Sequence, residues 1–164
     1  MKMLLKFLTL FMLVSFAATP AYAYAETASA TQFSDTALVA LTNADRAANG
    51  ASPVIENPLL SKAAQEKADD MVANDYFAHY APNGTSPWHW FTAVGYYYMH
   101  AGENLAMNFD DPVGLEAAWM ASPAHRANIV KGVYTQVGIG IAHGVYEGKP
   151  VVFVVELFAT PAKN

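Results

Sequence analysis

The stretch from Tyr134 to Ala159, "YTQVGIGIAHGVYEGKPVVFVVELFA", decides the fold class. Its first part, "YTQVGIGIA" (134–142), alternates as a strand does, and its last part, "VVFVVELFA" (151–159), is an apolar run rich in β-branched residues. Between them, "HGVYEGKP" (143–150) holds the glycines and the proline that are typical of a turn. The stretch therefore predicts an antiparallel hairpin near the end of the chain.

Helical patterns fill most of the chain before this hairpin. The clearest covers residues 57–76, where Asn57 can cap the helix and Pro58 suits its first position. Further helices are predicted over 34–50, 86–94, 111–121 and 122–132. Residues 96–108, "YYYMHAGENLAMN", are interpreted as irregular or extended. Several helices with one terminal antiparallel pair predict an α+β fold, arranged as a layered αβα domain.

The first residues have the pattern of an export signal rather than of fold material. Lys2 and Lys6 frame the start of an apolar run, and "AYAYA" (21–25) offers the small residues at which a signal peptidase cleaves. Pro20 ends the run, which is short for a membrane span of about 20 residues. We expect a signal peptide over 1–25, a short leader over 26–35 and one domain over 36–160. The mature chain is then secreted, extracellular or periplasmic, with no membrane span.

Charge and cysteine content exclude several classes of protein. The formal net charge is −5 and no basic cluster is present, which argues against nucleic acid as a partner. The chain has no cysteine, so a disulfide scaffold, a thiol nucleophile and lipoprotein attachment are excluded. None of the local signatures HExxH, GxSxG, the Walker loop or the Rossmann fingerprint occurs.

Two histidines lie at sequence positions that suit metal binding or proton transfer. His79 lies in "YFAHYAPNG", a loop after the clearest helix, where a surface role and a functional role are about equally frequent. His125 lies in "SPAHRANI", in the first turn of a predicted helix, where the helix dipole disfavours a positive charge. Neutral imidazole is the form that binds metals and accepts protons. The sequence positions of His89, His100 and His143 are weaker indications of a functional role.

Two carboxylates accompany these histidines. Glu103 lies between Gly102 and Asn104, just before an apolar run, and Gly102 is expected to let the backbone turn inward. Glu116 lies in "GLEAAWM", and its ordinary interpretation is a solvated carboxylate on a helix whose other face buries Trp119.

Taken in chain order, several stretches resemble one family. They follow the pattern FxH…NG…GY…GEN…W…SPxHRxNI…VGIG over about residues 36–159. This set resembles the CAP superfamily of SCP-like extracellular proteins, which includes cysteine-rich secretory proteins, antigen 5 and pathogenesis-related proteins. In having no cysteine, the chain resembles the bacterial branch of this superfamily.

The resemblance implies a three-layer αβα sandwich around an antiparallel sheet. It also implies a central cleft lined by two histidines and two acidic residues, which in some members binds a divalent cation such as zinc. By motif, His79 matches the first histidine and Glu103 matches the glutamate of the GEN signature.

The chain departs from the eukaryotic members at the other two positions. Ser122 stands where they have the second glutamate, and Val133 stands where they have the second histidine. Bacterial members carry the histidine of SPxHRxN, which is His125 here, and Glu116 is the remaining carboxylate. We expect His125 to take the role of the second histidine and Glu116 to line the cleft.

Three functional hypotheses follow. In the first, the cleft binds Zn²⁺ or another divalent cation, or a lipid or cell-wall ligand, without turnover; His79 and His125 are the metal ligands, Glu103 orients one of them, and Asn104 and Asn128 line the cleft. In the second, the protein is a metal-assisted hydrolase of a peptide, ester or cell-wall substrate, with Glu103 as general base. In the third, the glutamate and histidine only fix loops.

Overall fold

The computed structural model describes residues 33–163. Its elements are α2 (Asp35–Ala48), β1 (Ile55–Glu56), α3 (Pro58–Ala73), α4 (Trp88–Ala93), β2 (Tyr98–Met107), α5 (Pro112–Ala121), α6 (Pro123–Ile129), β3 (Gln136–Tyr146) and β4 (Lys149–Pro161). The strands form one sheet in the order β1-β3-β4-β2, antiparallel except for the short parallel pair of β1 with β3. The predicted signal peptide lies outside the described residues, and so does most of the predicted leader.

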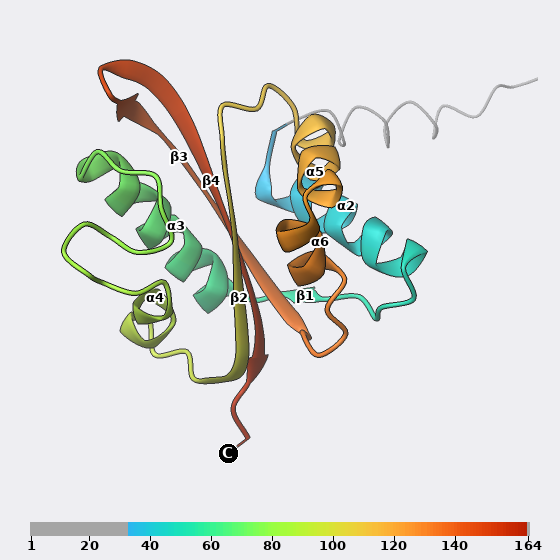
Figure 1. The fold of residues 1–164 in the computed structure, drawn as a ribbon. Coiled ribbons are helices and arrows are strands. Elements are labelled where there is room, and N and C mark those ends of the chain that lie inside the picture. Colours follow the sequence, from blue (N-terminus) through green and yellow to red (C-terminus); the bar gives the residue numbers. More distant parts are fainter. Residues whose placement is uncertain (1–32, 164) are drawn as a thin grey trace, which may run out of the picture.

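The sheet separates two layers of helices (Figure 1). One layer holds α3 and α4 and packs a core around Leu60, Phe91 and Phe153. The other holds α2, α5 and α6 and packs a second core around Leu38, Trp119 and Phe158. The predicted α+β class and three-layer αβα arrangement are therefore confirmed.

The helices begin where the sequence places their caps. The side chains of Ser34, Asn57 and Asp111 accept hydrogen bonds from backbone N–H groups in the first turns of α2, α3 and α5. These bonds satisfy donors that a helix start otherwise leaves unpaired. The exceptions are α4, whose cap position holds Pro87, and α6, where Ser122 occupies the cap position without a side-chain hydrogen bond.

Glycines of β3 bring α3 directly onto the sheet. A Cβ atom at Gly138 would lie 2.1 Å from the carbonyl carbon of Leu60, and one at Gly140 would lie 2.3 Å from that of Ala64. No side chain fits in this space, so the helix backbone rests on the strand backbone. The alternation in "VGIGIA" thus turns glycine toward α3, while Val137 and Ile139 enter the other core.

The turn of the terminal hairpin is shorter than predicted. Strand pairing continues to Tyr146 and Lys149, so the prediction of a turn over the whole of 143–150 is wrong. Glu147 and Gly148 make the turn, with φ of 49° and 76°. Positive φ at both central residues gives a turn whose twist matches the strands, which lets them pair to their ends.

The segment interpreted as irregular or extended contains a regular strand, β2. It pairs with β4 along its length, with a register shift between Tyr98 and His100. Residues from Gly102 to Ala106 are all buried, because helices cover both faces at this point. A strand buried on both faces lacks the alternation by which strands are predicted. Since β2 is the last strand of the sheet, one of its edges has no strand partner within residues 33–163.

Candidate functional site

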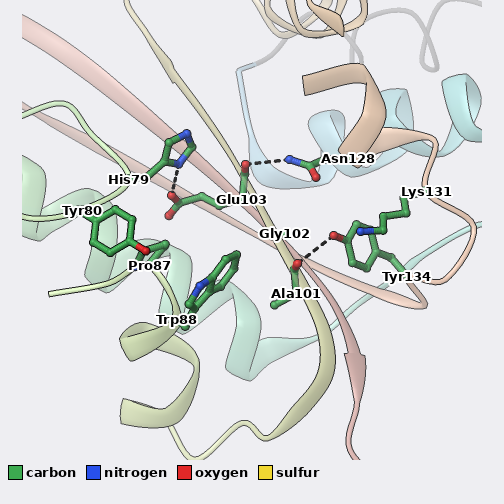
Figure 2. Close-up of a pocket in the computed structure, with 10 residues that line it drawn as sticks. All are labelled: His79, Tyr80, Pro87, Trp88, Ala101, Gly102, Glu103, Asn128, Lys131 and Tyr134. Atoms are coloured by element: carbon green, nitrogen blue, oxygen red, sulfur yellow. Dashed lines mark hydrogen bonds and ion pairs between the residues drawn. The ribbon is translucent and has the colours of Figure 1, made fainter. Parts of the chain in front are cut away.

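A cleft of about 330 Å³ lies at the free edge of β2 (Figure 2). It is lined by His79, Tyr80, Pro87, Trp88, Ala101, Gly102, Glu103, Asn128, Lys131 and Tyr134. These residues come from the loop after α3, the start of α4, β2, and α6 with the loop that follows it. The cleft therefore lies where both helical layers meet the edge of the sheet, and it holds the two residues that the family motifs single out.

His79 and Glu103 form the polar centre of the cleft. Nδ1 of His79 lies 2.5 Å from Oε1 of Glu103, and the dashed line in Figure 2 marks this contact. The side chain of His79 is 54% exposed, whereas that of Glu103 is 2% exposed. A buried carboxylate thus holds Nδ1, while the other ring nitrogen, Nε2, belongs to a half-exposed ring and makes no hydrogen bond to the described residues.

The pair changes the acidity of the histidine. The hydrogen bond to Glu103 raises the pKa of His79, and partial burial of the ring opposes the rise. A folded-state pKa above the unfolded value means that the folded protein binds the proton more tightly. The pair therefore stabilises the fold at low pH, and this contribution is lost as the pH rises through the raised pKa.

Glu103 also has an oxygen without a partner. Its Oε2 is buried and accepts no hydrogen bond from the described residues. Glu103 pairs across the sheet with Leu157, which packs in the α3 core, so its side chain faces the α3 layer and the His79 loop. A buried carboxylate oxygen without a hydrogen-bond donor lowers the stability of the fold, because its lost hydration is not replaced. It therefore marks a place where a ligand can supply the donor.

A buried lysine holds the His79 loop in place. Nζ of Lys67 donates to the carbonyl oxygens of Ala78 (2.9 Å) and His79 (3.1 Å) and to the hydroxyl of Tyr76 (2.9 Å). Burial lowers the pKa of Lys67, and the negative charge of Glu103 acts against that shift. Lys67 was not predicted from the sequence as a site residue, because a lysine in an amphipathic helix is usually solvated.

Side chains close the free edge of β2. Three alternate carbonyl oxygens of the strand each accept one side-chain hydrogen bond. The pairs are Ala101 with Tyr134 Oη (2.9 Å), Glu103 with Asn128 Nδ2 (3.0 Å) and Leu105 with Trp119 Nε1 (3.1 Å). Strand addition needs these carbonyl groups. A ligand of the cleft is therefore recognised by side chains rather than by strand pairing.

Gly102 has a different role from the predicted one. It lies inside β2 and is not among the residues with positive φ, so it does not turn the backbone. A Cβ atom here would lie 2.5 Å from the hydroxyl of Tyr134 and 3.2 Å from Oδ1 of Asn128. Glycine is needed because Tyr134 and Asn128 approach the strand closely, and those two side chains form one wall of the cleft (Figure 2).

His125 does not line the cleft but lies in a second pocket. This apolar pocket of about 290 Å³ is lined by His125 together with Phe77, Leu105, Met107 and Trp119, among others. The pKa of His125 is lowered, as the helix-start argument predicts, but burial is the main cause and the charge of His79 adds to it. Within residues 33–163, no three His, Asp or Glu side chains are grouped closely enough to hold a metal ion.

The other predicted residues divide between the cleft and the opposite face of the sheet. Asn128 lines the cleft, and its Nδ2 also donates to Oδ1 of Asn104 (2.9 Å). Asn104 in turn donates to Oε2 of Glu156 on the α2 and α5 side (3.0 Å). Glu116 is 3% exposed and lies on that side too, so its interpretation as a solvated carboxylate is wrong.

Glu156 was not predicted from the sequence as a buried polar residue. It is fully buried in β4 and accepts hydrogen bonds from Thr42 (2.8 Å) and Asn104 (3.0 Å). The signal was present as a single glutamate in the apolar run "VVFVVELFA". An acid in such a strand needs buried partners, and these come from α2 and β2, which the sequence does not place beside it.

The chain is similar in sequence to known proteins of one family. A model of the cysteine-rich secretory protein (CAP) family matches residues 39–158. YkwD of Bacillus subtilis is 39% identical over 103 residues, which cover 63% of this chain and 40% of YkwD. The chain thus spans well under half the length of this relative.

Solved structures share the fold. An extracellular protein with an SCP domain from Bacillus anthracis matches with a TM-score of 0.65 and 24% identity, over 88% of this chain and 45% of that one. An outer surface protein of Borrelia burgdorferi matches with a TM-score of 0.65 and 20% identity, over 76% of this chain and 90% of that one. Both neighbours are extracellular or surface proteins. Among the described residues, no helix has the length and apolar character to cross a membrane.

Proposed function

The chain belongs to the cysteine-rich secretory protein (CAP) family, and on that basis we propose that it is a secreted binding protein whose ligand occupies the cleft beside His79 and Glu103. One observation carries the proposal: a buried carboxylate fixes Nδ1 of an exposed histidine and keeps one oxygen without a donor. The large majority of buried polar atoms in native proteins have a hydrogen-bond partner, so this unpaired oxygen supports a ligand that donates to it.

We further propose that His79 binds Zn²⁺ or another divalent cation through Nε2. A carboxylate on the second ring nitrogen is the usual support of a metal-binding histidine, because it fixes the tautomer and the ring orientation. Glu103 has this relation to His79. His125 is the proposed second ligand, and burial keeps it in the neutral form that metal binding requires. When bound, the cation supplies Lewis acidity and open positions for water or ligand.

Zinc calorimetry on the untagged protein tests the cation. We expect the wild type to bind zinc, and the double variant His79→Ala/His125→Ala to bind it at least about tenfold more weakly. The matched control is His89→Ala/His143→Ala, which removes two exposed histidines outside the cleft and should leave the affinity unchanged. Affinity should fall as the pH drops below the raised pKa of His79, because protons compete for Nε2. No zinc binding by the wild type, or equal affinity in both double variants, contradicts the cation proposal.

Hydrolysis is the alternative function, and the same pair favours it. A histidine held at Nδ1 by a buried carboxylate can act as a general base through Nε2. The cleft lining contains no serine or threonine, so the nucleophile would be water. Peptide, ester and cell-wall substrates are the classes to test, with and without zinc. Loss of a detected activity in Glu103→Gln supports a hydrolase, and unchanged activity in that variant contradicts it.

The cleft and the His125 pocket suggest different ligands without turnover. The cleft combines the exposed rings of Tyr80 and Trp88 with the polar side chains of His79 and Lys131, which suits a cell-wall fragment. The pocket beside His125 is mainly apolar, which suits a lipid chain. Cell-wall ligands are the first class we propose, because the histidine and glutamate pair lies in the polar cleft.

A further inference from the structure

Two buried glutamates meet on the face of the sheet opposite the cleft. Glu116 of α5 is 3% exposed and Glu156 of β4 is fully buried. Both approach the hydroxyl of Thr42 on α2, whose Oγ1 lies 2.8 Å from Oε1 of Glu156 and 3.4 Å from Oε2 of Glu116. The second oxygen of Glu116 is buried and has no hydrogen-bond partner among the described residues.

One hydroxyl group cannot satisfy two ionised carboxylates. Thr42 has a single hydrogen to donate, and the short contact assigns it to Glu156. An ionised Glu116 would then have no donor for either oxygen. A protonated Glu116 can instead donate to Oγ1 of Thr42, which completes a chain from Glu116 through Thr42 to Glu156.

We infer that Glu116, Thr42 and Glu156 form an internal proton-binding site, in which one proton on Glu116 joins α5 and α2 to β4. The site takes a proton and not a metal ion as its ligand. It is separate from the His79 cleft and does not depend on the function proposed for that cleft.

The neighbouring groups place the proton on Glu116. From β2, Nδ2 of Asn104 donates to Glu156 (3.0 Å), and from α2 the positive charge of Arg46 favours the ionised form of Glu156. Glu116 faces the negative charges of Asp45 and Glu156 instead. Ile139 of β3 pairs with Glu156 and brings no charge.

Acidity shifts agree with this assignment. Burial, followed by the charges of Glu156 and Asp45, raises the pKa of Glu116 to about 9. Burial raises the pKa of Glu156 to about 7, against the opposing effects of Thr42, Asn104 and Arg46. The folded protein keeps protons that the unfolded chain loses near pH 4.5. The site therefore stabilises the fold at low pH, and its contribution falls as the pH rises toward 9.

Thermal unfolding of the whole protein from pH 5 to pH 9 tests the site. Glu116→Gln keeps the side-chain shape, and its amide N–H replaces the acid O–H toward Thr42. We expect the wild-type Tm to fall more steeply than that of the variant from pH 5 upward, so that at pH 8.5 the variant melts about 5 °C higher. His79 titrates in both proteins, so its contribution cancels in the difference between the two curves, which reports the Glu116 and Glu156 pair. The matched control, Glu66→Gln on the exposed face of α3, should follow the wild type.

Infrared spectroscopy detects the protonated carboxyl group directly. At pH 8, above the pKa of Glu156 and below that of Glu116, the wild type should show the carbonyl band of a buried un-ionised carboxylic acid, and Glu116→Gln should lack most of it. Absence of this band from the wild type, or parallel Tm curves for the wild type and Glu116→Gln, overturns the inference. A rise in wild-type Tm with Ca²⁺ or Mn²⁺ at pH 8.5 that Glu116→Gln abolishes also overturns it, because the ligand is then a metal ion.

Discussion

Replacing Arg46 by methionine is expected to lower the free energy of unfolding by about 3 kcal/mol or more. The guanidinium is fully buried and donates to four backbone carbonyl oxygens. These belong to Ser52 (2.8 Å), Ile129 (2.6 Å), Lys131 (3.1 Å) and Tyr134 (3.0 Å). Methionine leaves all four without their donor, and the carbonyls of Ile129 and Tyr134 lie in buried surroundings. The variant should also loosen the loop that carries Lys131 and Tyr134 to the cleft.

Urea unfolding monitored by circular dichroism measures this loss. Arg126→Met is the matched control, since Arg126 is exposed and makes one side-chain hydrogen bond, to Asn49. That change should cost no more than about 0.5 kcal/mol. Arg46→Lys should fall between the two, because an ammonium group cannot reach all four carbonyls. Equal stability of Arg46→Met and Arg126→Met shows that the four hydrogen bonds do not hold this loop.

Replacing Gly140 by valine is expected to cost about 3 kcal/mol or more, or to prevent folding. The first added carbon would lie 2.3 Å from the backbone of Ala64 and Gln65, and a helix backbone cannot move aside as a side chain can. The helix α3 would have to leave the sheet, and Lys67, which holds the His79 loop, would move with it.

Gly132→Val is the matched control for this substitution. Gly132 has open space where its Cβ would lie and is not among the residues with positive φ. Its change should leave the urea midpoint nearly unaltered, whereas Gly140→Val should unfold at much lower urea or be recovered only as unfolded protein. A native-like midpoint for Gly140→Val contradicts the direct packing of α3 on β3.

The helices could be predicted because capping interactions form between residues that are close in sequence. Asn57 caps the helix that it was expected to cap, because a side chain that accepts a hydrogen bond from the first turn acts within a few residues. The β2 strand could not be recognised in the same way. Both of its faces are buried by helices that are distant in sequence. The polar residues Glu103 and Asn104 also interrupt the apolar pattern by which a buried strand is predicted.

The candidate site was predictable in part. Motif resemblance identified His79 and Glu103, and the structure brings them into contact. It did not identify Lys67, because the need for a buried ammonium arises only when the loop folds back over α3. Nor did it place Glu116, whose setting is decided by Thr42 and Glu156 from two other elements. The sequence shows which side chains are available, and tertiary contacts decide which of them are buried together.

Nitrogen-15 NMR of His79 tests the central claim most directly. Above the raised pKa of this histidine, we expect its hydrogen on Nδ1, held by Glu103, with Nε2 bare and ready for a ligand. Glu103→Gln should lower the pKa of His79, since the hydrogen bond to Glu103 is the main cause of its rise. A hydrogen on Nε2 in the wild type, or a His79 pKa that Glu103→Gln leaves unchanged, contradicts the claim that this pair prepares the cleft for binding.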